Sequence, residues 1–373
     1  MTSPFTPFAL ERFMSRFEQD VEFNLSESGV HPITLRDLLA LGGMGVDDLA
    51  DVELNYPHAE GIPRLRANIA ALYPGAGPEN VLVTVGAIEA NMIISRTLVG
   101  PGQGIAVMVP NYLQVWGLAR NEGADLRTFR LREEAEWTLD LDELERAVTP
   151  GTRLVAVCNP NNPTGRVLTE QEMEAIVAAA DGAGAWILAD EVYRGAERVG
   201  DAETPTFFGR YDRVVAVGSM SKAYGLPGLR VGWAAGTPAL VEEIWARHEY
   251  TTISAGMLAN HLAALALSAE VRPRLLERTR GYIRRGFPIL RQWIEAHAGL
   301  LSLRPPDAAA IAFVRYGLDV PSAGLAETIR ADQGVLVVPG IHFGVEGHLR
   351  ISYGLPEAIV SEALDRIGRA LRP

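Results

Sequence analysis

The chain has 373 residues, of which 48% are hydrophobic and 21% are charged, a composition typical of a folded globular protein. Its formal net charge is −12, from 34 basic and 46 acidic residues, and so acidic a surface disfavours binding to nucleic acid or to anionic membranes. The one cysteine, Cys158, rules out an intramolecular disulfide framework and indicates a reducing compartment.

The N-terminal 40 residues contain two short helical patterns and one extended segment, Phe23–Pro32. Ionisable residues are spread through the first 22 positions, which argues against a signal peptide. No run of 18 uninterrupted apolar residues occurs in the sequence, which argues against a membrane span. We therefore expect a cytoplasmic protein.

Short apolar runs alternate with amphipathic stretches between about residues 80 and 240. The runs are apolar on both faces, as in a parallel sheet covered by helices. This alternation predicts a doubly wound α/β domain, which we assign to residues 46–256. The predicted strands are 81–86, 104–110, 153–159, 185–190, 214–220 and 231–236, and the predicted helices are 87–99, 139–148 and 170–181.

The pattern changes after about residue 256, where a long helical stretch runs to about residue 297. Three predicted strands (311–317, 335–338 and 348–353) then surround a helix near 321–332, and a helix over 356–371 ends the chain. We predict a smaller α+β domain over residues 257–373, with residues 1–45 packed against it. In open α/β sheets, ligands bind outside the carboxyl ends of the strands, so those ends are the places to search for chemistry.

Lys222 is the only lysine, and the other 33 of the 34 basic residues are arginine. Arginine can replace lysine at most surfaces, but its pKa is too high for it to act as a neutral amine nucleophile. Schiff-base chemistry requires that nucleophile. Lys222 is therefore a candidate catalytic residue.

Two further strand ends carry polar side chains. Asp190 ends the strand 185–190, where it could cap the next helix or pair with a cationic ligand, and Tyr193 follows it. Ser219 and Lys222 match the Ser-x-x-Lys motif of penicillin-binding proteins, but that mechanism needs a second lysine, which is absent from the sequence. A turn rich in hydroxyl groups, with Arg230 eight residues after Lys222, is more typical of phosphate binding.

The two remaining strand ends carry a turn and a helix start. Asn159–Gly165 reads as a turn rich in asparagine and proline. Gly86, Ala87 and Ile88 open a helix whose free backbone N–H groups could bind an anion. The three-glycine fingerprint of dinucleotide-binding proteins is missing there, which argues against NAD.

Taken together and in this order, these segments resemble the fold-type I pyridoxal-phosphate enzymes, specifically the class I and II aminotransferase family. The resemblance extends from about Tyr56 to Arg350 and is most specific in Ser219–Gly232, followed by Asn159–Gly165. It implies a three-layer α/β/α large domain with a mainly parallel sheet, plus a smaller α+β domain. It also implies a pyridoxal 5'-phosphate cofactor, an amino-acid substrate, no metal, and a homodimer with shared active sites.

The resemblance assigns a role to each candidate. Lys222 would form a Schiff base with the cofactor and later move the α-proton, and the reaction would pass through a quinonoid intermediate. Asp190 would pair with the ring nitrogen. Asn162 and Tyr193 would bind the ring oxygen, and Tyr112 would stack on the ring. Arg350, with Asn162, would bind the substrate carboxylate. The residues implied at the phosphate are Gly86, Ala87, Ile88, Ser219, Ser221 and Arg230, together with Tyr56 from the neighbouring subunit.

The segment Phe23–His31 departs from the glycine-rich stretch that is usual in these aminotransferases, where it crosses the substrate entrance. Its residues Ser28-Gly29-Val30-His31 resemble those of cyclising pyridoxal-phosphate enzymes of the capreomycidine synthase type, which act on hydroxylated arginine. Glu27 and Gly29 are therefore candidate substrate-binding residues. Glu27 could bind a basic side chain of the substrate or could simply be solvated. No second arginine can be assigned to a distal carboxylate of the substrate, so aspartate or glutamate is not supported as the preferred donor.

Three functions stay open on these residues. The first is an aminotransferase acting on an L-α-amino acid. The second is a lyase or cyclase with the same cofactor that eliminates or replaces a group at the β- or γ-carbon, with a hydroxylated arginine as one candidate substrate. The third, a regulator on the same fold, would need an added basic helix-turn-helix domain, and the chain has neither the length nor the charge for it.

Overall fold

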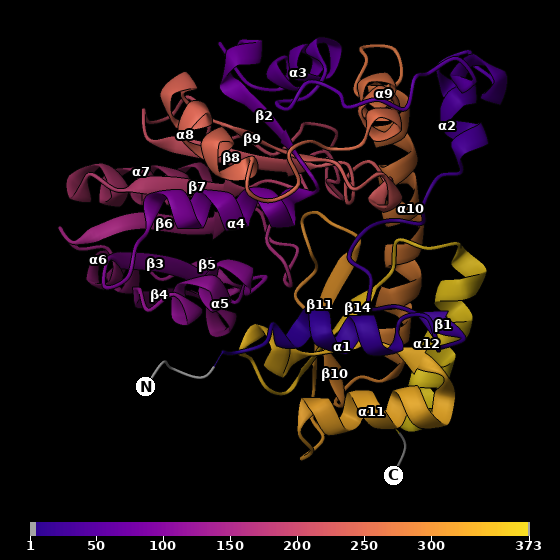
Figure 1. Ribbon diagram of the computed structural model, residues 1–373. Coiled ribbons are helices and arrows are strands. Elements are labelled where there is room, and N and C mark those ends of the chain that lie inside the picture. Colours follow the sequence, from indigo (N-terminus) through magenta and orange to yellow (C-terminus); the bar gives the residue numbers. More distant parts are fainter. Residues whose placement is uncertain (1–4, 372–373) are drawn as a thin grey trace.

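An eight-stranded sheet forms the centre of the larger domain in the computed structural model, which describes residues 5–371 (Figure 1). Neighbouring strands run parallel, except that β9 is antiparallel to both β2 and β8, and β5 is antiparallel to β4. The strands, in spatial order, are β2 (Val81–Thr84), β9 (Gly232–Ala235), β8 (Val214–Ser219), β7 (Trp186–Asp190), β6 (Thr152–Cys158), β3 (Gly104–Val109), β4 (Asp125–Arg132) and β5 (Thr138–Leu139).

Helices cover both faces of this sheet. Successive side chains of a strand point to opposite faces, and in β6 Leu154 and Ala156 enter one hydrophobic cluster while Val155 and Val157 enter another. The first cluster includes residues of α4 (Ala87–Leu98), α5 (Gln114–Asn121) and α8 (Pro238–His248), and the second includes residues of α6 (Leu141–Ala147) and α7 (Glu170–Ala183). The predicted three-layer α/β/α architecture is confirmed.

The smaller domain is built on the four-stranded antiparallel sheet β10-β11-β14-β13 and the helices that pack beside it. Its elements are α10 (Arg272–Ala296), β10 (Leu301–Ser302), β11 (Ile311–Tyr316), α11 (Ser322–Gln333), β12 (Val335–Leu336), β13 (Val338–Pro339), β14 (His348–Ser352) and α12 (Glu357–Ala370). The helix before them, α9 (Met257–Ala266), instead lies against α3 (Pro63–Ala70), where Asn68 Nδ2 donates to the carbonyl of Ala264 over 2.8 Å. The N-terminal strand β1 (Phe23–Asn24) pairs in parallel with β12, so backbone hydrogen bonds join the N-terminal segment to this domain.

The helix α1 (Ala9–Phe17) connects the two domains. Its buried side chains, Leu10 and Met14, belong to a cluster that contains Val157 of β6 and Phe313 of β11. This position brings the first helix of the chain to the junction where the strand ends of the large domain lie. The other elements are α2 (Leu35–Leu41), α3 (Pro63–Ala70) and short 3-10 helices at Val46–Leu49, Pro78–Asn80, Glu133–Ala135, Pro227–Leu229 and Gly340–Phe343.

Some elements differ from the sequence prediction. The strand predicted at 231–236 forms, but antiparallel to its neighbours, because an apolar run carries no information on strand direction. The sequence does not predict β4, because only Leu126, Phe129 and Leu131 of its eight residues are apolar and they form no continuous run. The helical stretch after residue 256 is two helices, since α10 starts afresh with Pro273 in its first turn. Within residues 5–371, no helix combines the length and the apolar character needed to cross a membrane.

Candidate active site

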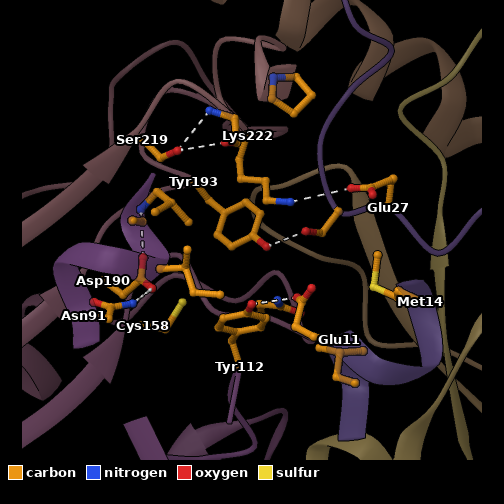
Figure 2. Close-up of a pocket in the computed structure, with 18 of the residues that line it drawn as sticks. Glu11, Met14, Glu27, Asn91, Tyr112, Cys158, Asp190, Tyr193, Ser219 and Lys222 are labelled. Carbon is orange, nitrogen blue, oxygen red and sulfur yellow. Dashed lines mark hydrogen bonds and ion pairs between the residues drawn. The ribbon is translucent and has the colours of Figure 1, made fainter. Parts of the chain in front are cut away.

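The last residues of three neighbouring parallel strands, Cys158 of β6, Asp190 of β7 and Ser219 of β8, line a cavity of about 280 Å³ (Figure 2). Parallel strands end at one edge of the sheet, which is why residues from distant parts of the sequence meet here. Helix α1 and strand β14 of the smaller domain also contribute lining residues, Met14 and Arg350. The cavity therefore lies at the junction of the two domains.

Lys222 follows β8 by three residues and extends its side chain into the cavity (Figure 2). The preceding turn is held by hydrogen bonds, since Ser221 N–H donates to Ser219 Oγ over 3.0 Å and Met220 N–H donates to the carbonyl of Val231. The amine Nζ lies 3.7 Å from Glu27 Oε2. A lysine side chain that is only 25% exposed and faces a cavity is placed to react with a bound molecule.

Asp190 lines the same cavity beside Asn91 of α4 (Figure 2). Its carboxylate accepts hydrogen bonds from Asn91 Nδ2 over 3.1 Å and from Val192 N–H over 3.2 Å. Burial nevertheless raises the pKa of Asp190 to about 6, because these two bonds offset only part of the desolvation of the carboxylate. Asp190 thus caps its own turn and also offers the cavity a carboxylate that a cationic group would stabilise.

Arg350 of β14 is 1% exposed and is held by two partners across the domain junction. Its Nη1 donates to Asn162 Oδ1 over 2.9 Å, and its Nη2 donates to the carbonyl of Ser26. Among residues 5–371, its buried Nε–H has no hydrogen-bond partner. A buried guanidinium that lines the cavity and keeps an unpaired donor is suited to a ligand carboxylate.

Gly86, Ala87 and Ile88 start α4 at the edge of the cavity, next to the guanidinium of Arg230. Gly86 has a φ of +77°, and a Cβ at this position would lie 2.8 Å from Arg230 Nη2, so only glycine fits. Ala87, Ile88 and Arg230 all line the cavity, as do Ser219 and Ser221. Backbone N–H groups at a helix start, two hydroxyls and a guanidinium form a donor set typical of a phosphate site.

Two tyrosines complete the wall. Tyr193, which is 2% exposed, donates from its hydroxyl to Ser28 Oγ over 2.8 Å, and its burial raises its pKa. The hydroxyl of Tyr112 donates to Glu11 Oε1 over 2.6 Å, and its ring packs edge-on against Phe8 (Figure 2). Both side chains line the cavity and are fixed by residues of the N-terminal segment.

The donor set fits pyridoxal phosphate. The glycine turn beside Arg230 suits the phosphate, the buried carboxylate of Asp190 suits a protonated ring nitrogen, and Lys222 supplies an amine for the aldehyde. Asn91 Oδ1 is buried and has no hydrogen-bond partner in the described part of the chain, so one more polar atom lies near Asp190. The cavity thus offers a complementary group to each functional part of that cofactor.

Three residues predicted for the site do not line the cavity. Gly29 packs behind it, where a Cβ would lie 3.1 Å from the carbonyl oxygen of Ser221 and 3.8 Å from Lys222 Cδ. Gly86 adjoins the cavity through Arg230. Tyr56 is 81% exposed and has no contact with the cavity of its own chain.

Sequence reasoning missed several residues that line the cavity, among them Glu11, Met14, Glu18 and Asn91. Asn91 could have been found, because it lies four residues after Ala87 and so on the same face of the helix that opens at the site. Nothing in the sequence indicates that α1 reaches a cavity whose Asp190, Lys222 and Arg350 lie more than 170 positions away.

The comparisons with known proteins agree with this geometry. The family model described as aminotransferase class I and II matches residues 49–367. The capreomycidine synthase of Streptomyces vinaceus is 34% identical over 358 residues, which is 93% of this chain and 89% of the synthase.

Two solved structures have the same fold over nearly their whole length. A PLP-dependent aminotransferase from Streptococcus suis has a TM-score of 0.93 and 32% identity, covering 99% of this chain and 98% of its own. The PLP-dependent cyclase OrfR has a TM-score of 0.89 and 27% identity, covering 100% of this chain and 98% of its own.

Proposed function

The chain belongs to the aminotransferase class I and II family and is a pyridoxal-phosphate-dependent enzyme, and we propose that it transfers the amino group of an L-α-amino acid at the cavity described above. One observation carries the proposal: an amine (Lys222), a buried carboxylate (Asp190) and a buried guanidinium (Arg350) line one cavity at the domain junction. These are the three groups that the cofactor's aldehyde, its ring nitrogen and the substrate carboxylate would each require.

When bound, pyridoxal phosphate supplies the electron sink that lets a proton leave the substrate α-carbon. The work of the protein is to hold the reactants and to move that proton. Arg350 orients the substrate by its carboxylate, because a planar guanidinium offers parallel N–H donors and is fixed by Asn162 and Ser26. Lys222 takes up the proton at its Nζ, and Asp190 stabilises positive charge on the ring nitrogen.

Product analysis tests this function. The purified enzyme is incubated with single amino acids, with and without a 2-oxo acid acceptor, and the products are identified. Without an acceptor, a transaminase forms at most about one equivalent of the donor's 2-oxo acid per active site, because the amino group stays on the enzyme. With an acceptor it turns over repeatedly and converts the acceptor into an amino acid. Repeated turnover that does not depend on the acceptor contradicts transamination.

A second candidate function is elimination, replacement or cyclisation at the β- or γ-carbon of an amino acid. The observation that favours it is the similarity, over nearly the whole chain, to a capreomycidine synthase and to a PLP-dependent cyclase. Both candidates begin with removal of the same α-proton, so the same residues would serve either reaction. In the product assay, this second activity appears as a cyclic or eliminated product that forms without any acceptor.

We also propose that the enzyme is a homodimer whose sites are shared between subunits. Large apolar side chains that are exposed in the single chain support this, among them Leu54 (81%), Tyr56 (81%), Tyr250 (91%) and Ile253 (50%). Large apolar side chains that are this exposed in a single chain are often covered by a partner chain. Tyr56 of the partner subunit would then reach the phosphate end of the cavity. A cytoplasmic location is our further proposal, supported by the single cysteine, Cys158, which is free and buried.

A further inference from the structure

Asn91 of α4 contacts the carboxylate that the proposed function assigns to the ring nitrogen of the cofactor. Its Nδ2 donates a hydrogen bond to Asp190 Oδ2 over 3.1 Å (Figure 2). Asn91 is 2% exposed and lines the cavity together with Asp190. The proposed function gives this amide no role, although it touches one of the three groups on which that function depends.

A second amide holds the side chain of Asn91. Its Nδ2 also donates to Gln114 Oε1 over 3.3 Å, and Gln114 Nε2 donates to the backbone carbonyl of Ile88. Gln114 is buried at the start of α5, and Ile88 lies in the first turn of α4. The three bonds connect Ile88, Gln114, Asn91 and Asp190 in that order, and we call them the amide link.

The donors and acceptors fix the direction of the amide link. A backbone carbonyl can only accept a hydrogen bond, so Gln114 presents its NH2 group to Ile88 and its oxygen to Asn91. Both acceptors of Asn91, Gln114 Oε1 and Asp190 Oδ2, then take hydrogens from the same NH2 group. Asn91 can therefore only donate to Asp190, and a donated hydrogen bond favours the ionised form of a carboxyl group.

An unpaired atom shows that this orientation is imposed on Asn91. Its Oδ1 is buried and finds no hydrogen-bond partner in residues 5–371, whereas buried polar atoms are almost always paired. Turning the amide over would instead place Oδ1 against two acceptor oxygens, those of Gln114 and Asp190. The two donated bonds are kept although Oδ1 stays unpaired, so contact with Gln114 and Asp190 sets the orientation of this side chain.

Asn91 also offsets the burial of Asp190. Burial raises the pKa of Asp190 to about 6, and among the groups that lower this pKa Asn91 ranks before Val192 N–H and the charge of Lys222. The proposed function engages Lys222 with the aldehyde of the cofactor, whereas Asn91 stays beside Asp190. A carboxylate that is stabilised in its ionised form leaves the shared proton on the ring nitrogen.

We propose that Asn91 is a positioning residue for the reaction, which together with Gln114 holds Asp190 ionised and directed at the ring nitrogen of the cofactor. The inference rests on the proposed function, because it takes Asp190 as the partner of that nitrogen. It also gives α4 two tasks, since Ala87 and Ile88 begin this helix at the phosphate site and Asn91 lies one turn further along the same face.

The titration of Asp190 in the cofactor-free protein tests the first half of the inference. Protein labelled with 13C at the aspartate carboxyl groups is titrated by NMR, and the signal that disappears in Asp190→Asn is assigned to Asp190. Asn91→Leu, which keeps the approximate volume and removes the donor, should increase the proton affinity of Asp190 by about 10 to 100 times, the worth of one hydrogen bond to a charged group.

Two comparisons make this measurement specific to Asn91. Ser95→Ala is the matched control, because Ser95 is buried on the same helix but does not line the cavity, and the titration should not change. The other titratable groups around Asp190 are the same in each variant, so they do not contribute to the difference: Tyr112, Cys158, Glu191, Tyr193 and Lys222.

A double-mutant cycle on the loaded enzyme tests the second half. The rate of α-proton removal is measured in single turnovers for the unmodified enzyme, Asn91→Leu, Asp190→Asn and the double variant. Asn91→Leu should lower the rate by about 10 times when Asp190 is present, and by about threefold or less when Asp190→Asn has already removed the charge. A purely structural asparagine would lower the rate equally in both backgrounds.

The possible results separate the inference from the proposed function. If Asn91→Leu leaves the titration of Asp190 unchanged, or slows α-proton removal equally with and without Asp190→Asn, the inference is wrong and the proposed function stands. If Asp190→Asn itself does not slow α-proton removal, the proposed role of Asp190 fails. Circular dichroism checks folding, and if Asn91→Leu does not fold, Gln114→Leu decides by the same titration, because it removes the bond that orients Asn91.

Discussion

The Nη1 atom of Arg350 donates to Oδ1 of Asn162 over 2.9 Å, across the junction of the two domains. Arg350 belongs to β14 of the smaller domain, whereas Asn162 lies in the turn after β6 of the large sheet. The bond fixes a guanidinium at the cavity, and in the proposed function it would couple the position of the substrate carboxylate to that of the cofactor. A shift of either domain would displace both.

We predict that Arg350→Lys lowers kcat/KM by roughly 10 to 100 times, the cost of one hydrogen bond to a charged group. An ammonium group is compact and cannot bond Asn162, Ser26 and a carboxylate with the geometry of a guanidinium. KM should rise and kcat should fall together, because the same contact aligns the α-hydrogen. The loss should be equal for arginine and for citrulline, its neutral analogue of the same length, and steady-state kinetics on both amino acids measure it. A loss confined to one of them would place Arg350 at the side chain.

Lys222→Ala should abolish turnover while the protein still binds cofactor through Arg230 and the start of α4. As the only lysine, Lys222 is the one side-chain amine that can bond to the aldehyde. Borohydride treatment of the loaded enzyme should therefore attach one cofactor per chain, on the peptide that contains Lys222, as read by mass spectrometry. Absence of that label would contradict the assigned role of this residue.

Asp190→Asn should lower kcat by roughly two to three orders of magnitude, because loss of a buried ionic partner is worth about 3–5 kcal/mol. Single-turnover absorbance measurements on the loaded enzyme give the rate of α-proton removal directly. Turnover near that of the unmodified enzyme would mean that Asp190 only caps its turn through Val192 N–H.

The same variant has an opposite effect on the stability of the cofactor-free protein. Burial raises the pKa of Asp190 from 3.8 to about 6, so the folded protein binds more protons than the unfolded chain between these values. Stability is therefore fully present below pH 3.8 and falls as pH rises through 6, by about 3 kcal/mol at most. Asp190→Asn should raise the Tm of the cofactor-free protein at pH 7 and not at pH 4, in paired thermal unfolding experiments.

Gly86→Ala should weaken cofactor binding by an order of magnitude or more. At a φ of +77°, alanine is strained, and its Cβ would lie 2.8 Å from Arg230 Nη2 and push the guanidinium away from the phosphate. Equilibrium titration with pyridoxal phosphate measures the effect, and Gly182→Ala, at a helical position where a Cβ meets nothing within 4 Å, is the control. Equal affinities in both variants would contradict the placing of the phosphate at this turn.

Mixing two inactive or weakened variants tests whether Tyr56 acts across a dimer. In a hybrid of Lys222→Ala and Tyr56→Phe chains, one site combines an intact Lys222 with Tyr56 of the partner subunit. Its activity should therefore exceed that of either variant alone. Sedimentation of the unmodified enzyme should give twice the 40.4 kDa chain mass, and an active monomer would contradict the shared site.

The sequence by itself determined the fold class, the family and the strand-end residues of the cavity. Buried parallel strands are short apolar runs, and the residues that end each run lie at a known edge of the sheet. Position therefore made Asp190, Ser219 and Lys222 candidates, and the resemblance implied a role for each. The single lysine pointed to its chemistry for a reason independent of structure, because no other side-chain amine exists in the chain.

Only the tertiary structure decided which other residues line the cavity. Glu11 and Glu18 lie on a helix whose sequence shows an apolar face and nothing about its partner, and Leu10 and Met14 of that helix pack against strands more than 140 residues away. The resemblance singled out Arg350 among 33 arginines, but its burial beside Asn162 follows only from the pairing of β14 with β11. Local propensity sets the elements, but contacts between distant segments depend on how complementary surfaces pack, and that information is spread over the whole chain.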